Sequence, residues 1–236
     1  MSRVWCRVVL LDAAGVIALP HRGLVAGALA RVGLEIDPGD VAAAHYRAVR
    51  SLDRGLGAGG RDPYLRALVL GLGVSGEHVG PAVDALVALA DPSRSGEILW
   101  SEAAPGALEA IDALRAGGAE VVVVTNSDGH AAGNLRDAGL FAGEVVDSEL
   151  VGSRKPDPEI FRVALERVGG DGEHAVHVGD SIAADVAGAR AVGIEAIHVD
   201  PGRACRGMDH RHVRSLAGLA RHVAPPAVRA PASRSR

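Results

Sequence analysis

The feature that most constrains the fold is a series of short, continuous runs of apolar, mostly β-branched residues. Clear runs occur at 8–11, 121–124, 175–178 and 196–199, and a weaker run occurs at 144–147. Continuous apolar runs of this length, as opposed to alternating ones, are typical of strands that are buried on both faces of a parallel sheet. Aromatic residues make up only 3% of the chain, so the core must be built from Val, Leu, Ile and Ala.

Helical patterns separate these runs. They cover 105–116, 130–138, 158–168 and 183–192, and a glycine follows each of them closely. Pro105 is expected in the first turn of its helix, and the following glycines mark the helix ends. Alternating strands and helices imply right-handed crossovers, so the sequence predicts an α/β fold with a Rossmann-like, doubly wound parallel sheet.

One long segment breaks this alternation. Between 18 and 98 no strand is expected, and helical patterns occur at 23–32, 40–52, 63–72 and 77–89, separated by glycine-rich turns. The expected domains are therefore a core formed by 1–17 and 99–223 and an inserted helical cap formed by 18–98. The last residues, 224–236, contain Pro, Ala, Ser and Arg without periodicity, which predicts a disordered tail.

Composition argues against several classes of function. The formal net charge is −4, and no basic stripe with interleaved aromatic residues appears, so nucleic acid is not an expected partner. No apolar stretch approaches the ~20 residues that a membrane span needs, and the first apolar run is too short for a signal sequence. Cys6 and Cys205 suggest neither a disulfide framework nor a metal site. We therefore expect a cytoplasmic protein.

Polar side chains follow the ends of the predicted strands. In an open α/β sheet the ligand crevice lies beyond the carboxyl ends of the strands, so these side chains are expected to converge. The set comprises Asp12, Thr125 with Asn126, Lys155, and Asp180 with Asp185.

Lys155 is the only lysine in the sequence; every other Lys or Arg position holds arginine. An ammonium group is a compact point charge, whereas guanidinium is a broad planar fork, so the two are not interchangeable where a small cation is required. Together with its acidic companions, Lys155 is therefore a candidate functional residue.

Four segments that contain these residues resemble the motifs of the haloacid dehalogenase superfamily of phosphohydrolases, in the subclass with an α-helical cap. They occur in the family's order over roughly 7–200: LLDAAGVIA, VVVVTNSD, GSRKPDPEIF and HVGDSIAADVAGARAVG. The resemblance implies a hydrolase that acts on a small phosphorylated metabolite. The oligomeric state is left open.

The resemblance also implies chemical roles for the first and fourth motifs. Asp12 would be the nucleophile that attacks phosphorus and gives an aspartyl-phosphate. Mg²⁺ would be held by Asp12, Asp180, Asp185 and the backbone carbonyl of Ala14, and would relieve the charge repulsion between carboxylate and phosphate.

The second and third motifs would bind the phosphoryl group. Thr125 and the amide groups near Asn126 would hydrogen-bond its oxygens. Lys155 would screen the charges of Asp12 and the phosphate and stabilise the transition state. In the helical segment, His21, His45, Arg47 and Arg50 are candidates for contact with the substrate.

The sequence departs from the family pattern at Ala14. The family's phosphatases carry a second Asp there, which protonates the leaving alcohol and then activates water. General acid–base catalysis is worth ~10² to 10⁴-fold, so ordinary alkyl phosphates are expected to turn over slowly.

Four explanations of Ala14 stay open. In the first, the substrate has a good leaving group, such as an acyl or aryl phosphate, or another acid such as His21 substitutes. In the second, the chain is an engineered inactive variant. In the third, it resembles the phosphonoacetaldehyde hydrolase branch, which has Ala here but needs a cap lysine that this sequence lacks. In the fourth, it is a non-catalytic phosphometabolite-binding protein. Dehalogenase chemistry is disfavoured, because those enzymes use no metal and would leave Asp180 and Asp185 without a role.

Overall fold

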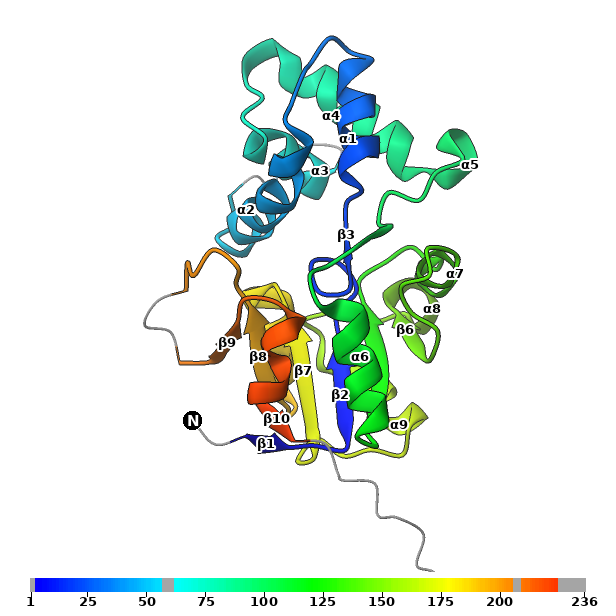
Figure 1. Cartoon of the computed structure of the whole chain (residues 1–236), viewed down its shortest axis with the longest axis vertical. Helices are drawn as coiled ribbons and strands as arrows, with labels where there is room; N and C mark the ends of the chain where they lie inside the picture. Colours follow the sequence, from blue (N-terminus) through cyan, green and yellow to red (C-terminus); the bar gives the residue numbers. More distant parts are fainter. Residues whose placement is uncertain (1–2, 57–61, 206–208, 225–236) are drawn as a thin grey trace, which may run out of the picture.

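The computed structural model describes residues 3–56, 62–205 and 209–224. Its centre is a six-stranded sheet in which every neighbouring pair of strands is parallel (Figure 1). In sheet order the strands are β6 (Val145–Asp147), β5 (Glu120–Thr125), β2 (Val8–Leu11), β7 (Ala175–Gly179), β8 (Glu195–Val199) and β9 (Arg211–Val213). The predicted α/β fold with a parallel sheet is confirmed, and all five predicted strands are present.

Helices cover both faces of the sheet. They are α6 (Ala107–Ala116), α7 (Ala131–Asp137), α8 (Ser148–Val151), α9 (Pro158–Arg167), α10 (Ala187–Ala191) and the 3₁₀ segment η4 (Leu216–Arg221). Successive residues of a strand point to opposite faces, so β2 contributes to two cores. Val9 and Leu11 pack in the same cluster as Ile111 of α6, whereas Val8 and Leu10 pack with Phe161 of α9. This division explains why the strand runs are continuously apolar.

Two helix predictions need correction. Pro105 lies in a turn before α6 and not in its first turn, because Gly106 adopts φ 74° and the helix begins only at Ala107. The range 183–192 is not one helix. It consists of a π-helical turn, η3 (Ile182–Val186), followed by α10.

The segment predicted to be helical forms a layer beyond the carboxyl ends of the sheet strands (Figure 1). It contains α1 (Arg22–Ala30), η1 (Pro38–Asp40), α2 (Val41–Asp53), α3 (Pro63–Gly71), η2 (Gly76–His78), α4 (Val79–Ala90) and α5 (Pro92–Ser95). These helices share their own apolar core, which includes Leu29, Leu68 and Leu86. The limits 18–98 for a cap domain stay a prediction.

Short strands lie outside the main sheet. β3 (Ala18–Leu19) pairs antiparallel with β4 (Glu102–Ala103) where the chain passes between the sheet and the helical layer. The expectation that 18–98 contains no strand is therefore wrong at β3. At the opposite end, β1 (Val4–Trp5) pairs with β10 (Val223–Ala224). The first residue of the predicted tail, Ala224, is thus paired in a strand, and 225–236 lie outside the described residues. No helix in the described ranges is long and apolar enough to cross a membrane.

Gly179, the last residue of β7, is a position where the fold requires the absence of a side chain. A Cβ atom there would lie 2.1 Å from Cγ of Asp185, which is buried in η3. We expect Gly179→Ala to lower the free energy of unfolding by about 1–3 kcal/mol through overpacking. Gly27→Ala is the matched control: a Cβ atom would meet nothing within 4 Å in the middle of α1, so it should stabilise by about 0.5–1 kcal/mol. Urea unfolding measures both, and equal stability of Gly179→Ala and the parent protein would contradict the assigned packing.

Candidate active site

Three adjacent strands position most of the predicted site residues. Asp12 follows β2, Thr125 ends β5, and Asp180 follows β7, and β2 lies between the other two strands. Each of these three residues is buried. They line a cleft of about 750 Å³, which also takes in Ala14, Asn126, Lys155 and Asp185. The structure thus gathers every predicted core site residue around one cleft.

Lys155 lies between two carboxylates. Its Nζ atom is 2.8 Å from Oδ1 of Asp12 and 2.7 Å from Oδ1 of Asp185. Its backbone is fixed by Asn126, whose Oδ1 accepts from the Lys155 N–H at 2.8 Å and whose Nδ2 donates to the Lys155 carbonyl at 2.9 Å. Burial alone would lower the pKa of Lys155, but Asp12 and Asp185 raise it above the usual range. The Lys155 side chain is therefore a charged ammonium group fixed between two carboxylates, and Asn126 positions the loop that carries it.

Asp185 is surrounded by donors. Besides Lys155, it accepts hydrogen bonds from Nε2 of His177 at 2.9 Å and from the backbone N–H of Ser181 at 2.9 Å. Burial would raise its pKa, yet the adjacent Lys155 and the His177 contact lower it well below the usual range. His177 lies in β7 and is fully buried, which lowers its own pKa. His177 was not among the predicted site residues, although a polar residue inside the apolar run 175–178 was the available signal.

Asp180 connects the core to the helical layer. Its Oδ2 atom lies 2.8 Å from Nε2 of His45, which belongs to α2. An ionised carboxylate only accepts, so Nε2 donates, and Nδ1 of His45 then accepts from the hydroxyl of Tyr64 at 2.9 Å. Tyr46 and Trp100 also pack edge-on against the His45 ring. Both tyrosines of the chain and one of its two tryptophans thus hold this histidine in place.

Of the four side chains of the helical segment that were predicted to contact substrate, His45 is the one that lines this cleft among the described residues. His21 instead caps α1, accepting from the backbone N–H of Leu24 at 3.3 Å. Arg47 donates to the carbonyl of Gly71, and Arg50 lies 4.0 Å from Asp200. His21 is thus engaged at the start of α1 and does not line the cleft that contains Ala14.

The three carboxylates of Asp12, Asp180 and Asp185 form a crowded, buried cluster, with one ligand oxygen of each lying within 4.8 Å of the others. Burial, together with the charges of Asp185 and Asp180, raises the pKa of Asp12 to about 7 despite the opposing effect of Lys155. Burial likewise raises the pKa of Asp180. A hard divalent cation that prefers oxygen ligands would relieve this repulsion, so the donor set fits Mg²⁺.

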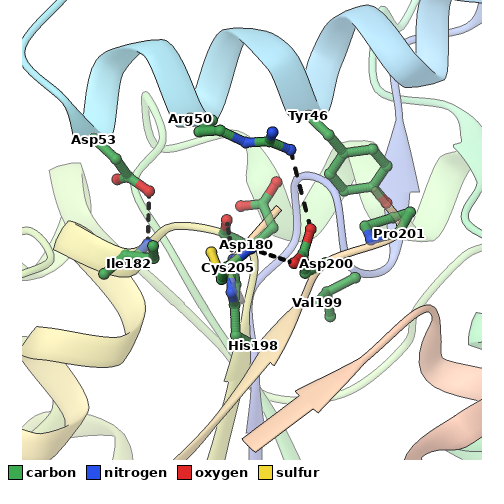
Figure 2. Close-up of a pocket in the computed structure, with 10 residues that line it drawn as sticks. All are labelled: Tyr46, Arg50, Asp53, Asp180, Ile182, His198, Val199, Asp200, Pro201 and Cys205. Atoms are coloured by element: carbon green, nitrogen blue, oxygen red, sulfur yellow. Dashed lines mark hydrogen bonds and ion pairs between the residues drawn. The ribbon is translucent and has the colours of Figure 1, made fainter. Parts of the chain in front are cut away.

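Asp53, at the end of α2, makes a second contact between the helical layer and the core. Its carboxylate accepts from Oγ of Ser181 at 2.6 Å and from the backbone N–H groups of Ile182 and Ala183 at 2.7 and 3.2 Å. Figure 2 shows Asp53 reaching down from α2 to Ile182. These are the otherwise open N–H groups at the start of η3, the turn that carries Asp185.

We expect Asp53→Ala to lower the free energy of unfolding by about 1–2 kcal/mol, because it removes a charged acceptor from these partly buried donors. Asp84→Ala is the control, since Asp84 is exposed on α4. Denaturant titration measures both variants. If Asp53→Ala were no less stable than Asp84→Ala, the contact between α2 and η3 would contribute nothing.

A sequence model of the haloacid dehalogenase-like hydrolases matches residues 6–193, most of the chain. The chain belongs to this family. A similar curated protein is the ribulose-1,5-bisphosphate 5-phosphatase of Halopiger xanaduensis, which is 33% identical over 128 residues, covering 52% of this chain and 54% of that protein. This haloacid dehalogenase-like hydrolase thus spans about half the length of the curated relatives it matches.

Solved structures agree on the fold. The magnesium-bound HAD hydrolase YfnB of Bacillus subtilis aligns with a TM-score of 0.62 and 23% identity, over 91% of this chain and 97% of its own. A dehalogenase in an intermediate complex aligns with a TM-score of 0.60 and 19% identity, over 94% and 99%. At these identities the matches establish the shared fold alone.

Proposed function

We propose that this haloacid dehalogenase-like hydrolase is a Mg²⁺-dependent phosphohydrolase that acts on a small phosphorylated metabolite through an aspartyl-phosphate. The observation that carries the proposal is the buried cluster in which Lys155 bridges Asp12 and Asp185 beside Asp180. The bisphosphate phosphatase among its relatives supports a phosphorylated substrate.

Asp12 is prepared for nucleophilic attack by its contacts. Oδ1 accepts from the backbone N–H of Ala13 at 2.7 Å and faces Nζ of Lys155 at 2.8 Å. No hydrogen bond from a described residue engages Oδ2. Oδ2 is therefore the oxygen free to attack, while Lys155 and the Ala13 amide hold the carboxylate in one orientation.

The proposed reaction has two displacements at phosphorus. In the first, Oδ2 of Asp12 forms a bond to phosphorus, and the bond from phosphorus to the leaving oxygen breaks. In the second, water attacks phosphorus, inorganic phosphate leaves, and the Asp12 carboxylate is restored. Lys155, Thr125 and the amide groups near Asn126 stabilise the charge on the phosphoryl oxygens. Mg²⁺ held by Asp12, Asp180, Asp185 and the Ala14 carbonyl would supply charge neutralisation between carboxylate and phosphate.

Ala14 lines the cleft but offers no proton to the leaving group. Substrates whose leaving group departs without protonation, such as acyl phosphates, are therefore proposed to react fastest. His45 is the candidate to substitute for the missing acid, because it is the histidine that lines the same cleft among the described residues. It replaces His21 in that role.

The absence of a titratable group at Ala14 also favours a second candidate, a protein that binds a phosphometabolite without hydrolysing it. One substrate series separates the two. With Mg²⁺, we expect kcat/KM for acetyl phosphate to exceed that for a sugar phosphate by on the order of 10²-fold or more, with p-nitrophenyl phosphate in between. If calorimetry detected binding of inorganic phosphate but neither this chain nor Ala14→Asp hydrolysed any of the three, the binding protein would be the correct assignment.

A further inference from the structure

A second cluster of metal-ligating side chains lies at the far edge of the sheet, apart from the three carboxylates. It consists of His198 in β8, Cys205 in the connection that follows, His210 just before β9 and His212 within β9. One ligand atom from each, three ring nitrogens and one sulfur, lies within 4.8 Å of the others. None of the four is needed for the proposed phosphohydrolase chemistry.

The sheet itself brings the three histidines together. His198 and His212 are register partners in the parallel pair of β8 and β9. His210 lies in the bend just before β9, two residues from His212, and its ring packs against the His212 ring. The ring centroids of His210 and His212 are 4.2 Å apart, and that of His198 lies 5.2 and 5.6 Å from them. The juxtaposition therefore follows from strand register.

Cys205 completes the group from the loop between these strands. It is a buried free thiol, and Figure 2 shows its sulfur close to the His198 ring beneath α2. Its backbone N–H donates to Oδ2 of Asp200 at 3.0 Å, which anchors this part of the loop to the end of β8. Cys6 and Cys205 alone did not suggest a metal site, but one cysteine suffices where three histidines supply the other ligands.

The hydrogen bonds leave lone pairs directed into the cluster. Nε2 of His198 lies 3.0 Å from the backbone carbonyl of Asp180, and because a carbonyl only accepts, Nε2 carries the proton. In the neutral ring, Nδ1 of His198 then carries the lone pair, and it faces Nε2 of His210 at 3.3 Å. Nε2 of His212 is buried and has no hydrogen-bond partner. Buried polar atoms without partners are costly unless something binds them.

We propose that His198, Cys205, His210 and His212 bind a structural Zn²⁺ ion. Imidazole nitrogens and a thiolate are the ligands that Zn²⁺ favours, and four protein ligands without an open position are typical of structural sites. Bond lengths of about 2.0–2.3 Å place tetrahedral ligand atoms about 3.3–3.8 Å apart, so only small side-chain movements would close the site. The cluster contains no carboxylate, which distinguishes it from the oxygen-rich Mg²⁺ site.

The position suggests what the ion would do. The chain passes from β8 to the parallel strand β9 within residues 200–210, and its described part forms no helix, although parallel crossovers usually contain one. A metal ion would therefore hold this short connection together. Since His198 also contacts the Asp180 carbonyl, the same ion would fix the backbone beside the carboxylate cluster.

The test is the zinc content of the full chain, purified from zinc-supplemented medium and exchanged into buffer with excess Mg²⁺. Mg²⁺ competes for the carboxylates but not for nitrogen and sulfur ligands. Mass spectrometry of the metal should find about one Zn²⁺ per chain. Cys205→Ala and His210→Ala should lose it. Cys6→Ala, which alters the other buried cysteine, and His130→Ala, which alters an exposed histidine, should keep it.

A second measurement needs no variant. Co²⁺ loaded into the unsubstituted chain should show a thiolate-to-cobalt charge-transfer band with the visible bands of tetrahedral coordination. The proposal is overturned if the unsubstituted chain holds no zinc, if Cys205→Ala and His210→Ala retain as much zinc as the unsubstituted chain, or if Mg²⁺ displaces the ion. A Co²⁺ complex without a thiolate band would also overturn it.

Discussion

Asp12→Asn should reduce the hydrolysis of acetyl phosphate by on the order of 10⁴-fold or more, as loss of a nucleophile does in other covalent mechanisms. Asn is nearly the same size as Asp but cannot form the proposed aspartyl-phosphate. The variant should stay folded, because Lys155 keeps its 2.7 Å ion pair with Asp185. Initial rates with saturating Mg²⁺ measure the effect, and thermal unfolding confirms the fold.

The matched control for this variant is Asp84→Asn, which makes the same chemical change at an exposed position of α4. It should keep the rate of the parent protein. An Asp12→Asn protein that retains even a tenth of the parental rate would show that Asp12 is not the nucleophile, and the phosphoryl group would have to be attacked by another group or by water directly.

Ala14→Asp should increase the hydrolysis of a sugar phosphate by about 10²- to 10⁴-fold, the usual worth of a general acid–base group. Ala14 already lines the cleft, two residues after Asp12, so the new carboxyl group would face the leaving oxygen. The gain should be much smaller for acetyl phosphate, whose leaving group needs no proton. Comparing kcat/KM for the two substrates in both proteins gives the result.

The control is the double variant in which Ala14→Asp is combined with Asp12→Asn, which should be as inactive as Asp12→Asn alone. A sugar phosphate rate unchanged by Ala14→Asp, in a protein shown to be folded, would mean that Ala14 does not occupy the acid–base position. A candidate such as His45 would then carry that function, and His45→Ala would be the variant to measure.

Much of the fold could be predicted because its central strands are buried on both faces. Val8, Leu10 and Val9 must each pack against a helix layer, so the run they form has no polar interruption. The edge strand β9 was not predicted, since its three residues, Arg211 to Val213, are mostly polar and half-buried. The two-residue strand β3 is too short to leave any pattern, and apolar spacing does not distinguish the π-helical turn η3 from an ordinary helix.

The site residues, too, include some that could be predicted from the sequence and some that could not. Asp12, Thr125 and Asp180 could be predicted to meet because strand order alone brings strand ends together. The contact between His45 and Asp180 spans 135 positions and depends on how the helical layer packs on the sheet. Neither spacing nor composition fixes that packing. The histidine and cysteine cluster was missed for a related reason, because it depends on the pairing register of β9.

Detection of the phosphoenzyme would test the proposed role of Asp12 as nucleophile. Without an acid–base group at Ala14, water is poorly activated, so the aspartyl-phosphate should accumulate once acetyl phosphate has reacted. Acid-quenched samples analysed by intact-protein and peptide mass spectrometry should show one added phosphoryl group on Asp12 that requires Mg²⁺. It should be absent from Asp12→Asn and shorter-lived in Ala14→Asp. Hydrolysis of acetyl phosphate with no adduct on Asp12 at any quench time, or an equal adduct in Asp12→Asn, would contradict the account.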